Sequence, residues 1–243
     1  YRTRFTEEFG ELVLCYDNKT NWRREYFPNY KYSRRKDRKA SKLDWGSIFD
    51  TLHLIKQELQ DNFPYKVLEV DNAEADDIIA SIVSWVNESP SHYERVLIVS
   101  GDKDFIQLQK HRFVAQYSPT LKKFVNGVDP DVYIKEHILK GDRSDGVPNF
   151  LSPDNCFVDE MRQRPISKKK LATWIDLDPE DFCNEEMLRN YQRNRTLIDL
   201  EYAPDNITKA CVEAYLNSTV KDRSGLLNYF IKHRLKNHME NIG

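Results

Sequence analysis

The nine residues VLIVSGDKD, numbered 96–104, decide the expected fold. Four aliphatic residues in a row are typical of a strand that is buried on both faces, and this strand runs directly into two aspartates. Two other segments follow the same pattern: LVLCY at 12–16 is followed by Asp17, and YKVLEV at 65–70 is followed by Asp71. Strands of this kind predict a parallel sheet with an acidic carboxyl edge, which is where such sheets bind ligands.

Helical patterns lie between these strands. Apolar residues recur at three- and four-residue spacing over 45–59 and 75–86, so we expect an α/β core with a parallel sheet covered on both faces. Strands are hard to find after residue 131, and helices are predicted over 131–140, 168–175, 184–197 and 205–217. We therefore expect a core at 1–130 and a mostly helical subdomain at 131–243.

The composition is that of a globular chain with a substantial core. The chain has 243 residues, 40% of them apolar, with 37 Lys and Arg against 39 Asp and Glu. Its longest aliphatic strings have about four residues, so no membrane-spanning helix is expected. The four cysteines lie far apart, and the sequence contains no CxxC, GxGxxG, GxxxxGK[ST] or HExxH motif. Because these cysteines do not form a disulfide pattern, we expect them to be reduced and the protein to be cytoplasmic, in the host cytoplasm if the source is a virus.

The net charge of the whole chain is near zero, but charge is distributed unevenly along it. Between Lys31 and Lys42 there are seven basic residues and one acidic residue, so this segment carries +6 and the rest of the chain carries −8. This distribution predicts one surface for an anion and another for cations. Residues 22–35 also interleave aromatic rings with cations, which suits phosphate contacts and stacking on unpaired bases. A solvated charged helix is the simpler alternative.

A second basic cluster follows Ser167, which we expect to cap a helix that begins at Lys168. A helix N-terminus favours phosphate, so this cluster is a second candidate for backbone contacts. The two basic regions together supply the candidate nucleic-acid contacts, which are Arg23, Arg24, Tyr30, Lys31, Arg34, Arg35, Lys168, Lys169 and Lys170.

Acidic residues gather in three clusters, EADD at 74–77, GDKD at 101–104 and GDRSDG at 141–146. Any one of them suits a helix N-terminus or a turn. If they converge with Asp17 at one sheet edge, their repulsion requires protons or cations, and oxygen ligands without His or Cys select Mg²⁺ or Mn²⁺. Two such ions about 3.5–4 Å apart would suit phosphodiester hydrolysis. The candidate metal ligands are Asp17, Glu74, Asp76, Asp77, Asp102, Asp104, Asp142 and Asp145.

These motifs, in this order, resemble those of the structure-specific 5′ nucleases, a family of 5′→3′ exonucleases and flap endonucleases. The three acidic clusters look like the acidic motifs of the family, and Trp22-Arg23 followed by Tyr30-Lys31 and Arg34 resembles its arch motif in spacing. LKGD at 139–142, QYSP at 116–119 and LIDLEYAPDNI at 197–207 resemble the T-even bacteriophage ribonuclease H branch of that family.

The resemblance implies a PIN-like nuclease core with a basic arch at about 20–45 and a helix-three-turn-helix between residue 131 and about residue 170. It also implies a nuclease with two Mg²⁺ ions, for which Mn²⁺ can substitute. Asp17, Asp76 and Asp102 would lie nearest the first ion. Glu74, Asp104, Asp142 and Asp145 would support the second ion, with Asp77 behind them. Lys31 and Arg34 would contact the scissile phosphate, so the expected catalytic residues are Lys31, Arg34, Asp17, Asp76 and Asp102.

Two departures from the family pattern bear on activity and ion binding. The family carries another catalytic aspartate on a strand upstream of the Asp17 motif, whereas none of the sixteen residues before Asp17 is an aspartate. We therefore expect that the first strand is missing and that this chain cuts poorly. Residues NFLS at 149–152 lack the glycine-rich loop that can hold potassium in relatives, which argues against a potassium site.

Three functions remain open from the sequence. A nuclease would act on flaps, nicks and RNA primers in replication, whereas a catalytically impaired protein would bind branched DNA without cutting it. A phosphatase would use Asp102 and Asp104 as a nucleophile pair, against which Phe105-Ile106 and the arch segment argue. The expected partners are flap DNA, RNA–DNA hybrids and, as in relatives, a single-strand-binding protein and a sliding clamp. We expect a monomer, and we interpret His137 as a packing residue.

Overall fold

In the computed structural model, which describes residues 1–88 and 94–239, the strands lie between residues 13 and 124. β1 (Val13–Tyr16) runs parallel to β2 (Lys66–Glu69), and β3 (Val96–Val99) runs parallel to β4 (Val114–Ser118). β5 (Lys123–Phe124) adds to β4 in the antiparallel direction. The strands predicted at 12–16, 65–70 and 95–99 are thus confirmed, with bounds that differ by one residue.

The prediction of one parallel sheet was wrong for the described residues, in which the strands form a two-stranded and a three-stranded sheet. β4 was not predicted, because its central residue Gln116 breaks the apolar pattern of a buried strand. Gln116 is 1% exposed, and its amide donates to the carbonyls of Ser100 at 3.0 Å and Asp102 at 2.6 Å. These bonds satisfy the buried amide and hold the acidic loop after β3.

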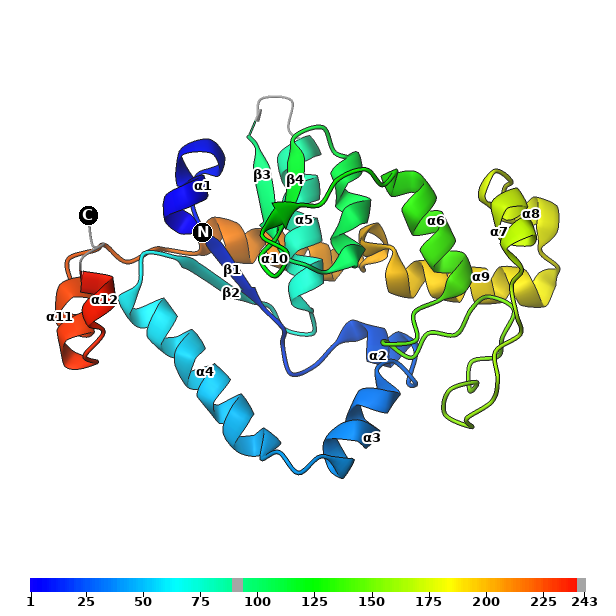
Figure 1. The fold of residues 1–243 in the computed structure, drawn as a ribbon, viewed down its shortest axis with the longest axis horizontal. Coiled ribbons are helices and arrows are strands. Elements are labelled where there is room, and N and C mark those ends of the chain that lie inside the picture. The colour runs from blue at the N-terminus through cyan, green and yellow to red at the C-terminus, as the bar shows by residue number, and fades with distance from the viewer. Residues whose placement is uncertain (89–93, 240–243) are drawn as a thin grey trace.

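Two helices of the first half, α3 (Tyr32–Ala40) and α4 (Trp45–Asn62), project from the rest of the molecule, and α4 meets β2 near the C-terminal end of the helix. They form the two sides of an open V below the sheets (Figure 1), and neither helix contains a buried residue. The helix predicted at 45–59 is present, but only its C-terminal end meets β2, so the prediction that its apolar face covers the sheet was wrong. Its apolar residues Phe49, Leu52 and Ile55 are exposed. The basic segment therefore projects into solvent.

The remaining helices follow the predicted ones closely in the second half of the chain. The four predicted there, at 131–140, 168–175, 184–197 and 205–217, are confirmed to within a residue at each end. The helices not yet named are α1 (Arg2–Phe9), α2 (Trp22–Tyr26), α5 (Ala75–Glu88), the 3₁₀ helix η1 (Lys103–Lys110), α6 (Pro130–Lys140), α7 (Lys168–Ile175), α8 (Pro179–Phe182), α9 (Glu185–Ile198), the 3₁₀ helix η2 (Leu200–Tyr202), α10 (Asp205–Asn217), α11 (Leu226–Lys232) and α12 (Lys236–Met239).

The hydrophobic core joins the two halves of the chain. Ile207 and Cys211 of α10 pack with Leu68 of β2 and Ile78 of α5, so a C-terminal helix completes the strand-bearing core. A second cluster brings Phe27 and Tyr30 together with residues of α6, α9 and the loop after α6. This second cluster fixes the base of the basic segment against the loop that carries Asp142 and Asp145.

The expected helix-three-turn-helix is not evident in the backbone. Residues 141–167, between α6 and α7, contain turns and extended backbone and no helix. None of the helices within 1–88 and 94–239 combines the length and the hydropathy needed to cross a bilayer.

Candidate active site

Four chain segments carry acidic residues to one part of the molecule. Asp17 follows β1, and the acids of 74–77 lie at the start of α5. The other two segments follow β3 and α6. A pocket is lined by Asp76, Asp104, Asp142 and Asp145, together with Arg23 and Tyr30. Residues from all three acidic clusters therefore line one pocket, although Asp76 and Asp145 are 69 positions apart along the chain.

Backbone hydrogen bonds to carboxylates shape these segments. Asp17 Oδ1 accepts from Ala75 N at 2.8 Å, which ties the end of β1 to the first turn of α5. Asp102 Oδ1 accepts from Asp104 N at 3.0 Å, and Asp142 Oδ1 accepts from Asp145 N at 3.2 Å. Aspartates favour such local turns, so the acidic residues fold the loops on which their neighbours are presented.

Burial and repulsion raise the pKa of two carboxyls in the pocket. Burial, aided by the charge of Glu74, raises the pKa of Asp76 to about 7, and Asp102 adds to the effect. Burial also raises the pKa of Asp104 to about 6 against the opposing charge of His137, and the negative charges of Asp102 and Asp142 add to the rise. A cation in the pocket would relieve both effects by stabilising the ionised carboxylates.

Side chains from the basic segment lie directly on two of the carboxylates. Lys31 Nζ pairs with Glu74 and lies 3.7 Å from Asp145 Oδ2, and Arg34 Nη2 lies 2.6 Å from Asp145 Oδ1. The Tyr30 hydroxyl is 2.9 Å from Glu74 Oε2 and 2.8 Å from Asp145 Oδ2. Although burial opposes it, the charges of Lys31 and Arg23 hold the pKa of Glu74 below its ordinary value. Cationic and acidic motifs therefore meet at one point.

The backbone also joins the basic segment to the acidic loop. Lys31, in the left-handed region with φ 53°, donates its amide to the carbonyl of Asp145 at 2.7 Å. Gly146 has φ 75°, and a Cβ there would lie 2.9 Å from the carbonyl oxygen of Asn29. Glycine is required at this position because its φ is left-handed and the two backbones approach too closely for a side chain.

Arg23 requires a correction, because the sequence predicted that it contacts nucleic acid. Its side chain is buried, and Nη1 lies 2.8 Å from Asp77 Oδ1 and 3.3 Å from Glu74 Oε2, while Nε donates to the carbonyl of Leu197 at 3.0 Å. Asp77 is also fully buried and accepts from Trp22 Nε1 at 3.2 Å. Arg23 therefore lines the pocket from its buried side and, with Asp77 behind it, supports Glu74, so the prediction of Asp77 as a direct metal ligand is also corrected.

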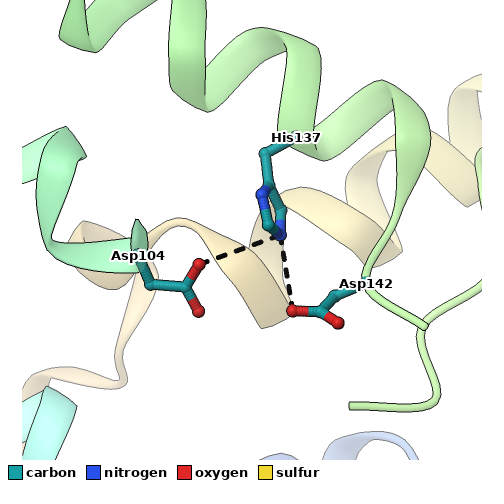
Figure 2. A group of neighbouring side chains, drawn as sticks. All are labelled: Asp104, His137 and Asp142. Atoms are coloured by element: carbon teal, nitrogen blue, oxygen red, sulfur yellow. Dashed lines mark ion pairs between the residues drawn. The ribbon is translucent and has the colours of Figure 1, made fainter. Parts of the chain in front are cut away.

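His137 reaches the acidic site from the last turn of α6, which the sequence analysis missed. Its Nε2 atom lies 3.5 Å from Asp142 Oδ2 and 3.9 Å from Asp104 Oδ1, so the ring stands between carboxylates from two other segments (Figure 2). Burial would raise the pKa of Asp142, but its contacts with His137 and Ser144 hold that pKa well below the ordinary value. A histidine five residues before the acidic Gly-Asp turn was the available sequence signal.

The other predicted residues lie at the edge of the site or away from it. Asp17 and Asp102 are exposed, and Asp102 is close enough to influence Asp76. Within 1–88 and 94–239, the one group whose potential ligand atoms all lie within 4.8 Å of one another is Asp104, His137 and Asp142. The exposed residues Lys168, Lys169 and Lys170 begin α7, where Ser167 Oγ accepts from Lys170 N at 3.3 Å, as predicted for its cap. Arg35 is exposed and Arg24 is half-buried.

Comparison with known proteins identifies two family regions that together span nearly the whole chain. Residues 3–137 match the family described as 5′-3′ exonuclease, N-terminal resolvase-like domain, and residues 128–243 match the one described as T4 RNase H, C terminal. The chain is 34% identical over 233 residues to ribonuclease H of Enterobacteria phage T4, covering 92% of this chain and 75% of that protein. It is also 30% identical over 221 residues to DNA polymerase I of Lactococcus lactis, which covers 86% of this chain and 24% of the polymerase.

Solved structures show the same fold. The phage T5 D15 protein, co-crystallised with metal ions, matches with a TM-score of 0.56 at 19% identity, covering 87% of this chain and 95% of that one. The T5 D15 flap endonuclease in a complex with DNA and metal ions matches with a TM-score of 0.50 at 20% identity, covering 83% and 82%. The chain belongs to the 5′→3′ exonuclease and flap endonuclease family, and it is a 5′ nuclease that hydrolyses phosphodiesters.

Proposed function

We propose that this chain cleaves phosphodiesters near the 5′ ends of flaps, nicks and RNA primers during replication, with two divalent ions held by its carboxylates. The observation that carries this proposal is the direct contact of Lys31 and Arg34 with Glu74 and Asp145. A phosphate group would attract Lys31 and Arg34, and bound metal ions would need Glu74 and Asp145. Since these cations and carboxylates lie in contact, a phosphate and metal ions could be held together at the site of one reaction. The T5 D15 structures with metal ions, and with DNA, support the same assignment.

The residues divide by position within this site. Asp17, Asp76 and Asp102 would hold one ion, and Glu74, Asp104, Asp142 and Asp145 would hold the other, with Mg²⁺ as the natural ion and Mn²⁺ as a substitute. Bound divalent ions supply a nucleophilic water at neutral pH and offset charge on the leaving oxygen. Arg23 and Asp77 keep Glu74 oriented from behind, as their buried contacts indicate.

Lys31 and Arg34 would exchange carboxylate partners for phosphate oxygens when a strand binds. Arg34 is 46% exposed at its side chain and Lys31 is 12% exposed, so Arg34 is the more accessible to an incoming strand and Lys31 lies deeper, next to the reacting phosphate. Tyr30 would stay with the carboxylates, since it is buried. A cation aimed at the scissile phosphate stabilises charge that grows in the transition state.

The duplex would lie against the second half of the chain. Lys168, Lys169 and Lys170 are exposed at the N-terminus of α7, where cations and backbone N–H groups favour phosphate. We propose that α6, the segment 141–167 and α7 serve as the helix-three-turn-helix of the family. We also propose that residues 1–130 are the nuclease core and residues 131–243 the DNA-binding subdomain, except that α10 of the second segment packs into the core. RNA–DNA hybrids are included as substrates, and the chain acts as a monomer in the cytoplasm.

A cleavage assay on a 5′-labelled flap substrate tests this function. We expect short 5′ products with Mg²⁺ or Mn²⁺, no cleavage in EDTA, and at least about a hundredfold loss of rate in Asp76→Asn. Asp131→Asn is the matched control, because Asp131 is exposed in the first turn of α6. Tight flap binding without cleavage in either metal would favour the alternative, a catalytically impaired branched-DNA-binding protein.

A further inference from the structure

His137 contributes the one nitrogen in the group of potential metal ligands. Among residues 1–88 and 94–239, the group with all ligand atoms within 4.8 Å consists of two carboxylates and this imidazole. The three side chains come from η1, from α6 and from the turn after α6, and all three point toward a common centre (Figure 2). The imidazole is thus directed at the carboxylates by the tertiary fold.

The contacts of His137 hold its Nε2 atom between two carboxylates, where an ion would also lie. The atom is inaccessible to solvent and makes no hydrogen bond, although it lies 3.5 Å from Asp142 Oδ2 and 3.9 Å from Asp104 Oδ1. The two carboxylates pair with this atom only when the imidazole carries a proton. A bound metal ion would take the place of that proton between the same three groups.

Asp142 is oriented for the same purpose. Its Oδ1 atom accepts from Ser144 N at 2.7 Å, from Ser144 Oγ at 2.7 Å and from Asp145 N at 3.2 Å. These three bonds direct the other oxygen, Oδ2, toward His137 (Figure 2). Such supporting bonds are a usual feature of protein metal ligands, because they fix the direction of the donor atom.

The spacing also suits coordination. Two donors bound to one ion at about 2.1 Å each stand about 3.0–3.5 Å apart. The separation between Nε2 and Asp142 Oδ2 already meets this value, and the separation from Asp104 Oδ1 exceeds it by less than half an ångström. All three ligand atoms lie within 4.8 Å of one another, so an ion at their centre would draw the carboxylates inward by side-chain rotation.

We propose that His137 is a direct ligand of the ion held by Asp104 and Asp142, which adds one nitrogen donor to the carboxylates of this position in the nuclease site. The proposal rests on the proposed metal-dependent function and deepens it. Imidazole favours transition metals, whereas Mg²⁺ prefers an all-oxygen environment. This position therefore binds Co²⁺, Zn²⁺ or Mn²⁺ more tightly than it binds Mg²⁺. Mg²⁺ occupies both positions when it is the abundant ion, and the two positions hold different ions when several metals compete.

Spectroscopy of the metal-loaded chain tests the nitrogen ligand directly. With Mn²⁺ added below one equivalent, electron spin-echo modulation from ¹⁴N is expected in the wild-type chain and is expected to vanish in His137→Gln, which keeps a polar side chain but has no imidazole. His111→Gln is the matched control, because His111 also has a buried Nε2 without a hydrogen bond and lies 3.6 Å from Glu201. Circular dichroism confirms that both variants fold.

Calorimetric titrations give a second readout. We expect Co²⁺ affinity to fall at least tenfold in His137→Gln and Mg²⁺ affinity to change less than about threefold, with His111→Gln unchanged. Mn²⁺ binding without ¹⁴N modulation in the wild-type chain, or modulation that survives in His137→Gln, would overturn the ligand assignment while the nuclease function stands. Failure of every ion to bind would count against both the assignment and the proposed function.

Discussion

At the scale of single residues, Lys31 links the two halves of the candidate site, since it pairs with Glu74 and lies 3.7 Å from Asp145 Oδ2. In Lys31→Ala we expect the single-turnover cleavage rate to fall about 10²–10³-fold, because charge that develops on the phosphate loses its cation. Flap binding, measured by fluorescence anisotropy, should weaken far less. Lys209→Ala on the exposed surface of α10 is the control. Equal losses in rate and binding would contradict this role.

Arg23 is a second test at this scale, and its readout is stability. Arg23→Met leaves Glu74 and Asp77 buried without their cation, so the free energy of unfolding should fall by about 3–5 kcal/mol. Urea denaturation followed by circular dichroism measures the change. Arg162→Met, at an exposed position, should alter stability by less than about 0.5 kcal/mol. An Arg23→Met chain as stable as wild type would show that the buried ion pairs have been misassigned.

At the scale of elements, the N-terminus of α7 should act on binding where Lys31 acts on rate. Replacing Lys168, Lys169 and Lys170 with alanine should weaken flap binding and reduce the slope of log K against log salt by about one for each lost phosphate contact. Cleavage at saturating enzyme should stay nearly unchanged. Exposed Lys122 and Lys123, replaced together, provide a control at the hairpin of β4 and β5. An unaltered salt slope in the α7 variant would remove this helix from the interface.

Helices and strands were well predicted where the local order of apolar residues reflects burial. They were less well predicted where contacts with distant segments decide whether a residue is buried. α5 and β3 were predicted because burial imposes a 3.6-residue or a continuous apolar pattern on the chain. α4 shows the limit of this reasoning, since its apolar residues read as a core face but remain exposed. β4 shows the opposite case, since polar Gln116 sits fully buried and is satisfied by two carbonyls.

At the scale of the whole molecule, the acidic pocket should make stability depend on divalent ions. When the free ion concentration is about a hundred times the Kd, ions that bind only the folded chain raise the free energy of unfolding by about 2.7 kcal/mol. For a chain of this size, that raises the Tm by about 6–10 °C. Differential scanning calorimetry of EDTA-treated protein, with and without Mn²⁺, measures the shift. The double variant Asp104→Asn and Asp142→Asn should lose much of it. The same Tm with and without Mn²⁺ in the wild-type chain would argue against a metal site in the pocket.

The sequence by itself determined which segments carry the chemistry. Strand ends that run into acids, and a basic segment rich in aromatic residues, were readable because carboxylates at a sheet edge and cations on a projecting helix leave a local pattern. The meeting of residues from 74–77, 101–104 and 141–146 in one pocket followed from the topology of parallel strands and the loop after α6.

Only the tertiary structure decided what each charged residue does there. A local sequence shows that Arg23 is basic and that His137 lies on a helix, but it does not show which distant groups they face. Arg23 is buried against Glu74 and Asp77, and His137 is directed at Asp104 and Asp142, because α2, α6 and η1 pack where they do. Burial and pairing set the charge state and the partner of such groups, and both depend on contacts between segments that lie far apart in the chain.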